Sequence, residues 1–240
     1  MKVFVIIPAA GLGTRMGSVS ATAQGKLRSK QFVELGGVPI LIHTLRKFAS
    51  CVAKEAIWVA MRKSEAEAFT AELQQAGLTG VNLVEGGEHR QQSVASALNA
   101  LPAAPDDIVL IHDAVRPFVD KETIQGVIEA TQKYGAAIAG VPAIDTIKQV
   151  ERTSDGARIM STIPREHIVQ AQTPQGFRYA ILKKAFDEAT AEGFLGTDES
   201  SLLERAGQDV HVVMGSPRNM KITTPADLEL AEFFAAQEKR

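Results

Sequence analysis

The feature that most constrains this sequence is an apolar segment that runs directly into a loop of small residues. Residues 3–8 read Val-Phe-Val-Ile-Ile-Pro, a composition that favours a β-strand, and the proline ends the strand because it has no N–H to donate. Four small residues open the loop that follows: Ala9, Ala10, Gly11 and Gly13. Such residues let a ligand approach the backbone, whose N–H groups bind phosphate oxygens, and Arg15 adds a permanent positive charge. We therefore expect a nucleotide-phosphate site at the end of the first strand.

The glycine spacing by itself leaves other interpretations open. The Gly-x-Gly-x-x-Gly pattern of dinucleotide-binding domains requires Gly or Ala where this chain has Met16, and no dependable acidic residue follows about 20 positions later to hold a ribose. A Walker phosphate-binding loop is absent, because no Gly-Lys-Ser/Thr follows the glycines. A nicotinamide-dependent dehydrogenase and an ordinary glycine turn therefore remain as alternatives.

Composition places the chain among soluble α/β proteins. Its 240 residues are 45% hydrophobic and 22% charged, which suits one domain over residues 1–240 with a full core. The formal net charge of -2 gives no general attraction for nucleic acid or a membrane surface, and no apolar run approaches the length of a membrane span. The single cysteine, Cys51, cannot form an internal disulfide and is expected to be a buried structural thiol. Since the N-terminus also has no charged leader, we predict a cytoplasmic protein.

Strand-like and helix-like segments alternate along the chain, which predicts a Rossmann-like, doubly wound α/β fold with a mostly parallel, twisted sheet. Further strands are expected over residues 56–61, 81–84, 107–112, 136–141 and 210–214. Helices are expected over residues 39–48, 64–77, 94–101 and 121–134, and from residue 225 onward. Three of the helices have N-terminal capping residues: Ser64 with Glu67, Asp120, and Thr224 before Pro225.

Residues 142–166 interrupt this alternation. Two extended runs, 146–150 and 158–162, flank a Ser-Asp-Gly turn at 154–156, a pattern typical of a two-stranded hairpin. A two-stranded ribbon buries little apolar surface by itself, so it needs another surface to pack against. A plain surface hairpin is one interpretation of this segment, and a ribbon that packs on a second surface is the other.

Eight short segments together carry a resemblance to a known family. They are residues 8–16, 30–32, 86–93, 109–117, 145–148, 172–175, 197–200 and 219–223. In this order they resemble the 2-C-methyl-D-erythritol 4-phosphate cytidylyltransferases, enzymes of the non-mevalonate isoprenoid pathway. The resemblance implies a transferase that joins CTP to 2-C-methyl-D-erythritol 4-phosphate with Mg²⁺, giving 4-diphosphocytidyl-2-C-methyl-D-erythritol and pyrophosphate. It also implies that residues 142–166 form a protruding β-arm, which crosses to the second subunit of a homodimer. A ribitol-5-phosphate cytidylyltransferase and a catalytically silent nucleotide-binding regulator are the alternatives.

The resemblance also assigns roles to single residues. The expected catalytic residues are three cations that hold phosphates: Arg15, Lys30 and Lys221. The expected CTP-binding residues are Ala9, Ala10, Gly11, Gly13, Gly87, Glu88, Ser93, Asp113 and Ala114. The expected acceptor-binding residues are Thr146, Arg165, Thr173, Thr197 and Asp198, with Arg165 reaching from the arm of the partner chain.

The chemistry of such a reaction explains why cations dominate this set. The attacking phosphate oxygen is already anionic, so the reaction needs no strong general base. The obstacle is the charge that builds up at the α-phosphorus as pyrophosphate leaves, and fixed cations and Mg²⁺ stabilise it. Asp113 follows the strand 107–112 directly, where open α/β sheets bind ligands, and is expected to hold the ribose or Mg²⁺. His112 is expected to be structural, and the histidines and Cys51 have no zinc-site spacing.

Some of these assignments have open alternatives. The stretch between Gly17 and Ser29 is longer than in the family and rich in Ser, Ala and Gly; it is expected to be a mobile lid. It puts Lys26 and Arg28 in competition with Lys30. Ser93 is a helix cap in the alternative interpretation, and Glu88 stands where the family often has aspartate.

Overall fold

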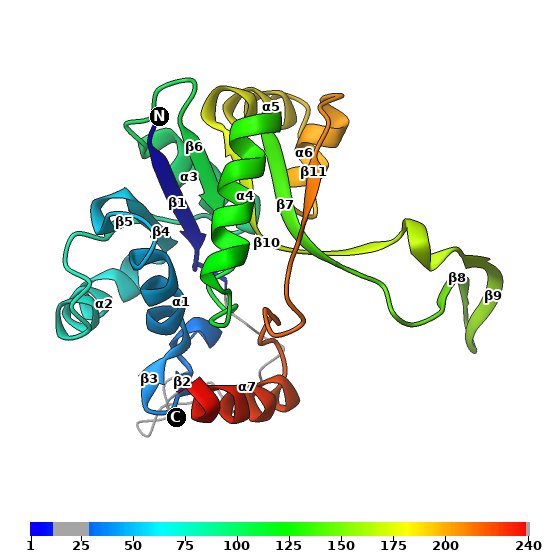
Figure 1. The fold of residues 1–240 in the computed structure, drawn as a ribbon, viewed down its shortest axis with the longest axis horizontal. Helices are drawn as coiled ribbons and strands as arrows, with labels where there is room; N and C mark the ends of the chain where they lie inside the picture. The colour runs from blue at the N-terminus through cyan, green and yellow to red at the C-terminus, as the bar shows by residue number, and fades with distance from the viewer. Residues whose placement is uncertain (12–28, 239–240) are drawn as a thin grey trace.

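A seven-stranded sheet forms the centre of the molecule (Figure 1). The computed structural model describes residues 1–11 and 29–238 of the chain. The strand order is β11-β7-β10-β6-β1-β4-β5, and β10 alone runs antiparallel to its two neighbours. The strands are β1 (Val3–Pro8), β4 (Ile57–Met61), β5 (Asn82–Glu85), β6 (Ile108–Ile111), β7 (Ala136–Pro142), β10 (Val169–Arg178) and β11 (His211–Met214). The predicted α/β class with a mostly parallel sheet is confirmed.

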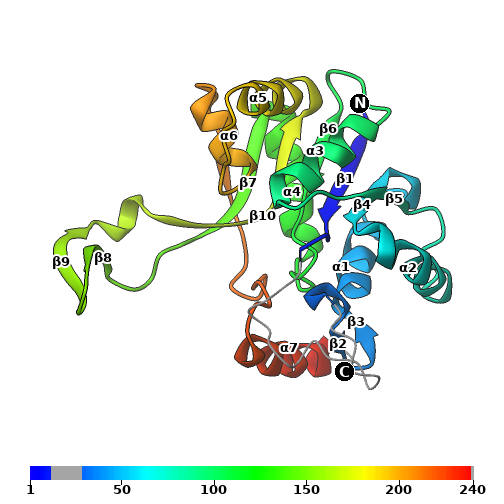
Figure 2. The ribbon, with the colours of Figure 1, turned by 180° about the vertical axis from the view of Figure 1, so that it is seen from behind.

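Helices cover both faces of this sheet (Figures 1 and 2). On one face the core is built with α1 (Ile40–Ala49), α2 (Lys63–Gln75) and α4 (Lys121–Tyr134). On the other face it is built with α3 (Arg90–Ala100), α5 (Tyr179–Ala191) and α6 (Glu199–Arg205). Because both faces are covered, all four residues of β6 are fully buried, which explains its uninterrupted apolar sequence.

A third, smaller core lies at the end of the sheet to which β1 points. Helix α7 (Pro225–Glu238) lies across this end, beside the short strands β2 (Glu34–Leu35) and β3 (Val38–Pro39) (Figure 1). Its buried members are Leu35, Ile40, Val115, Phe118, Ile222 and Ala231. The loop that follows β6, which contributes Val115 and Phe118, is therefore held between the sheet and α7.

Two of the three predicted helix caps are confirmed. The carboxylate of Asp120 accepts the N–H of Thr123 at 2.7 Å, and α4 ends at Gly135 with a φ of 90°. The hydroxyl of Thr224 accepts the N–H of Asp227 at 3.3 Å, and the Asp227 carboxylate accepts the N–H of Thr224 at 2.8 Å.

The predicted cap at Ser64 is wrong. Helix α2 begins one residue earlier, at Lys63, so Ser64 lies inside its first turn. β4 ends at Met61, so only Arg62 separates it from α2, and the backbone of Arg62 is extended. Nε of Arg62 donates to the carbonyl oxygen of Ala10 at 3.0 Å. Cys51 is only partly buried, and it packs against the core that contains α1, α2 and α4.

Three elements were not predicted from the sequence: β10, α5 and α6. β10 reads Val-Gln-Ala-Gln-Thr-Pro-Gln-Gly-Phe-Arg, and an internal proline argues against a central strand. The structure accommodates Pro174 in an irregular stretch, where the pairing with β7 shifts register between Ala171 and Gln175. The Thr173–Pro174 peptide bond in this stretch is cis.

The predicted ribbon is confirmed as a two-stranded antiparallel arm that projects from the body (Figure 1). It consists of β8 (Ile147–Thr153) and β9 (Gly156–Ile163), whose residues are exposed except for partly covered ends. Val150, Ile159 and Met160 are among its exposed apolar side chains. Among the described residues no helix combines the length and apolar character needed to cross a membrane.

Candidate active site

A cavity of about 140 Å³ opens where β1 and β6 end and α3 begins. This is the end of the sheet at which open α/β folds bind ligands. Ten of the residues assigned to CTP or to catalysis line it: Ala9, Ala10, Gly11, Lys30, Gly87, Glu88, Ser93, Asp113, Ala114 and Lys221. Lys221 lines it from the loop that precedes α7. We call this cavity the first pocket.

One side of the first pocket is a tight turn at Gly86 and Gly87. A Cβ on Gly86 would lie 2.6 Å from Cβ of Ala10, and a Cβ on Gly87 would lie 2.5 Å from Cβ of Gln92. The hydroxyl of Ser93 accepts the N–H of Gly87 at 3.1 Å. The N-cap of α3 is His89, so the alternative interpretation of Ser93 as the cap is wrong. Ser93 instead fixes the glycine turn against the pocket.

The first two residues after β1, Ala9 and Ala10, are fixed through their carbonyl groups. The side-chain amide of Gln31 donates to the carbonyl oxygen of Ala9, and Arg62 donates to that of Ala10. Gln31 is 2% exposed and also lines the pocket. Both carbonyl oxygens therefore have protein donors.

Asp113 is the electrostatic centre of the site. Its carboxylate contacts Nε of Arg90 at 3.1 Å, Nε of Arg116 at 3.2 Å and Nζ of Lys221 at 2.9 Å. Burial by itself raises the pKa of Asp113, but the charges of Arg90, Lys221 and Arg116 outweigh it and hold the pKa well below its usual range. Asp113 is therefore ionised at neutral pH, and it holds three cations around one point.

Behind Asp113, a hydrogen-bond chain fixes the backbone. The N–H of Asp113 donates to Oγ1 of Thr173 at 3.0 Å, and this hydroxyl contacts Nδ1 of His112 at 3.0 Å. Nε2 of His112 lies 3.0 Å from the carbonyl oxygen of Arg116. Burial lowers the pKa of His112 to about 4, so the ring is neutral at pH 7, with Nε2 donating and Nδ1 accepting. His112 has the structural role expected from the sequence.

A second cavity, of about 220 Å³, adjoins the first and shares three lining residues with it: Arg90, Asp113 and Lys221. Thr173, Thr197 and Asp198, all assigned to the acceptor, line this second pocket. The Asp198 carboxylate accepts the N–H of Ser201 at 3.0 Å, and so caps α6, and it accepts Nε2 of Gln175 at 2.7 Å. Two cavities thus meet at one cluster of charges.

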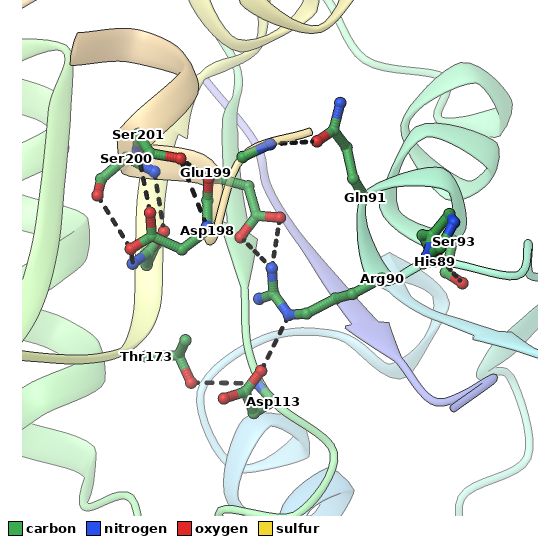
Figure 3. Close-up of polar contacts among 12 residues, drawn as sticks. His89, Arg90, Gln91, Ser93, Asp113, Thr173, Asp198, Glu199, Ser200 and Ser201 are labelled. Carbon is green, nitrogen blue, oxygen red and sulfur yellow. Dashed lines mark hydrogen bonds and ion pairs between the residues drawn. The ribbon is translucent and has the colours of Figure 1, made fainter. Parts of the chain in front are cut away.

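Arg90 and Glu199 belong to this cluster, and the sequence analysis assigned them no role. Nη1 of Arg90 donates to both oxygens of Glu199, at 2.7 and 2.9 Å, and joins the start of α3 to the start of α6 (Figure 3). Both residues lie inside segments that carried the family resemblance. Their position in those segments was the available signal, but nothing in the sequence shows that they touch.

A model of the 2-C-methyl-D-erythritol 4-phosphate cytidylyltransferase (IspD) family matches residues 3–237. The chain belongs to this family. It is 58% identical over 238 residues to the 2-C-methyl-D-erythritol 4-phosphate cytidylyltransferase of Acidobacterium capsulatum, covering 99% of this chain and 98% of the relative. It is 50% identical over 240 residues to the protein of the same name from Solibacter usitatus, covering 99% and 97%.

Solved structures from the cytidylyltransferase family also match the fold. The chain is 36% identical to a crystal structure of 2-C-methyl-D-erythritol 4-phosphate cytidylyltransferase from Francisella tularensis, with a TM-score of 0.79 and coverage of 97% and 99%. It is 30% identical to 4-diphosphocytidyl-2C-methyl-D-erythritol synthase from Anaerococcus prevotii, with a TM-score of 0.80 and coverage of 98% and 96%. Each match spans the body and the arm, because each covers nearly the whole chain.

Some residues with expected roles in a cytidylyltransferase lie away from these pockets. Thr146 and Arg165 are exposed at the base of the arm, and neither lines the two pockets formed by the described residues. Nη1 of Arg165 donates to the carbonyl oxygen of Ile144 at 2.5 Å. The predictions for Gly13, Arg15 and the lid, with Lys26 and Arg28, fall outside the described residues.

The donor set around Asp113 limits how a divalent cation could bind. Within residues 1–11 and 29–238, no three His, Cys, Asp or Glu side chains gather in a way that could hold a metal ion. Among the cations that the structure describes, Arg116 and Lys221 contact Oδ2 of Asp113, whereas Arg90 contacts Oδ1. Mg²⁺ typically keeps water ligands and takes one or two carboxylates together with substrate phosphates. The residues fit such an ion if Asp113 Oδ1 is its one protein ligand.

Proposed function

We propose that this chain transfers the cytidylyl group of CTP to 2-C-methyl-D-erythritol 4-phosphate. A phosphate oxygen of the acceptor forms a bond to the α-phosphorus of CTP. The bond from that phosphorus to the oxygen bridging the α- and β-phosphates breaks, and its electron pair leaves with pyrophosphate. The products are 4-diphosphocytidyl-2-C-methyl-D-erythritol and pyrophosphate. The observation that carries the proposal is the meeting of two pockets at Asp113 and Lys221, in a chain of this family.

The first pocket is proposed to bind CTP. The turn at Gly87 and Ser93 offers a narrow slot with backbone groups and a hydroxyl, which suits the polar edge of cytosine. Glu88 and Ala114 line the same slot, and the backbone of Ala9, Ala10 and Gly11 borders the phosphates. Lys30 supplies positive charge to the triphosphate, together with Arg15.

The second pocket is proposed to bind the acceptor. Thr173, Thr197 and Asp198 offer hydrogen-bond partners for its hydroxyl groups. Lys221 lies where the pockets meet, so its ammonium group can hold the acceptor phosphate against the α-phosphate. Thr146 and Arg165 are proposed to reach this phosphate from the arm of a second copy of the chain, in a homodimer.

Mg²⁺ is proposed to bind with the nucleotide. When bound, it neutralises charge on the phosphate oxygens of CTP. Asp113 Oδ1 would be its protein ligand, and the same carboxylate orients Arg90, Arg116 and Lys221. We also propose that the enzyme acts in the cytoplasm, in agreement with its single cysteine.

The test is turnover by the purified full-length chain. CTP and Mg²⁺ are supplied with either 2-C-methyl-D-erythritol 4-phosphate or ribitol 5-phosphate, and pyrophosphate release is measured together with the mass of the product. We expect turnover with the erythritol phosphate and a much lower kcat/KM with ribitol 5-phosphate. Faster turnover of ribitol 5-phosphate, or CTP binding without any pyrophosphate release, would overturn the proposal. The names of the family and of its relatives favour the erythritol phosphate.

A further inference from the structure

The contact between Glu199 and Arg90 has no part in the mechanism derived above. Glu199 is the first residue of α6 and is 1% exposed. Both of its carboxylate oxygens accept from Nη1 of Arg90. A buried carboxylate is costly unless it is paired and hydrogen-bonded, so Glu199 depends on Arg90 as its counter-ion.

Arg90 lies between the two pockets and lines both of them. Its Nε donates to Asp113 and its Nη1 to Glu199, so two carboxylates from different elements fix the guanidinium plane (Figure 3). Within residues 1–11 and 29–238, Nη2 of Arg90 has no hydrogen-bond acceptor, and the Arg90 side chain is 29% exposed. An arginine held in this way has donors left for an anion where the pockets meet.

The charge balance of the cluster also depends on Glu199. Asp113 by itself faces three cations, since Arg116 and Lys221 contact it as well as Arg90. Glu199 supplies a second carboxylate that binds Arg90 from the other side. If Glu199 lost its charge, only the hydrogen bond from Nε to Asp113 would orient the guanidinium among the described residues. The guanidinium could then turn about that hydrogen bond.

A separate pair of hydrogen bonds holds α3 to the segment before α6. Nε2 of Gln91 donates to the carbonyl oxygen of Phe194 at 3.0 Å, and Oε1 of Gln91 accepts the N–H of Gly196 at 2.9 Å. The elements therefore remain joined by neutral contacts when Glu199 is changed. A Gln91 variant therefore weakens the connection between α3 and the segment before α6 without removing a contact of Arg90.

We propose that Glu199 is a positioning residue, which orients Arg90 so that its unpaired Nη2 donates to a phosphate oxygen at the junction of the two pockets. This inference rests on the proposed function, because the phosphate in question is that of the acceptor. Glu199 itself touches no substrate and acts only through Arg90.

The experiment compares Glu199→Gln with the wild-type enzyme in steady-state turnover, at a temperature where circular dichroism shows both to be folded. We expect kcat/KM for the acceptor to fall about 10- to 100-fold, the range for one lost charge-assisted hydrogen bond. The Kd for CTP, measured by calorimetry without acceptor, should change by less than about threefold, because the base site does not involve Glu199. Glu199→Asp, which keeps the charge on a shorter side chain, should recover part of the loss. Glu204→Gln, an exposed carboxylate on the same helix, is the matched control.

Two further variants separate positioning from folding. In an Arg90→Lys background, Glu199→Gln should have little additional effect on kcat/KM, because Glu199 acts through the guanidinium. Gln91→Met should lower Tm and leave kcat/KM within about threefold of wild type. Wild-type kinetics in Glu199→Gln, or additive losses with Arg90→Lys, would overturn this inference and leave the proposed function standing. Absence of turnover in the wild-type enzyme would contradict the proposed function itself.

Discussion

The junction of the two pockets and the β-arm are built in opposite ways. At the junction, the side chain of Asp113 is 9% exposed and contacts three cations, and a buried hydrogen-bond chain through Thr173 and His112 fixes its backbone. In the arm, the central residues of both strands are exposed, and the contact of Arg165 is a hydrogen bond to the backbone carbonyl of Ile144 at the base of the arm. The described residues of one chain thus pre-organise the junction and the pocket that we propose for CTP, which together we call the nucleotide half. The acceptor half lacks the two residues, Thr146 and Arg165, that we propose come from a second copy.

The largest expected effects come from the cations of the pre-organised half. Lys221→Met and Lys30→Met should each lower kcat about 10²–10³-fold, because each removes a fixed charge that stabilises the phosphates in the transition state. Single-turnover rates at saturating CTP measure the loss, and Lys184→Met, on exposed α5 surface, is the control.

Lys26→Met is measured beside Lys30→Met. An inactive Lys26→Met together with a nearly wild-type Lys30→Met would show that the longer loop has shifted the role to Lys26.

His112, buried behind Asp113 at the junction, should also make the free energy of unfolding depend on pH. The pKa of His112 is about 4 in the folded chain and about 6.5 in the unfolded chain, so the unfolded state binds the proton more tightly. The stability that the neutral ring contributes is complete above pH 6.5 and is lost as the pH falls to 4, a loss on the order of 3 kcal/mol. Urea unfolding in EDTA between pH 4 and 8 measures it. His112→Gln should flatten this dependence, and an unchanged slope in that variant would contradict the assignment.

In the arm, a substitution should affect binding of the acceptor and spare the nucleotide. Arg165→Ala should raise KM for the acceptor about 10- to 100-fold, because a charge-assisted contact to its phosphate is lost. The Kd for CTP and the Tm should remain close to wild type. Arg152→Ala, exposed further along the same arm, serves as the control. An equal loss of CTP affinity in Arg165→Ala would contradict the claim that Arg165 contacts the acceptor and not the nucleotide.

A smaller effect is expected at the base site. Gly87→Ala places a Cβ 2.5 Å from Cβ of Gln92, so the turn must shift. Overpacking of this kind costs about 1–3 kcal/mol, and we expect KM for CTP to rise about 5- to 100-fold while KM for the acceptor stays within about threefold. Gly126→Ala, within α4, is the comparison. A larger change in KM for the acceptor than for CTP would contradict the assignment of the slot beside Gly87 to cytosine.

The same contrast explains how much the sequence could predict. Local patterns identified β6, the cap at Asp120 and the turn of the arm, because each depends on neighbouring residues. The family resemblance identified most of the pocket lining.

The contacts that organise the site escaped prediction because they join distant segments. Arg90 and Glu199 are 109 positions apart, and Asp113 and Thr173 are 60 apart. β10 was missed for a related reason, since Pro174 is tolerated only because the pairing with β7 shifts around it.

The central claim is that one chain completes the nucleotide half and a second chain completes the acceptor half. Lys221→Ala and Arg165→Ala enzymes are mixed in equal amounts and allowed to exchange subunits, and activity is measured at an acceptor concentration below the wild-type KM, where each variant alone has low activity. A mixed dimer has both defects in one site and leaves the other site intact, so random exchange predicts recovery to about a quarter of wild-type activity. No recovery, when native mass spectrometry shows that mixed dimers have formed, would contradict the claim.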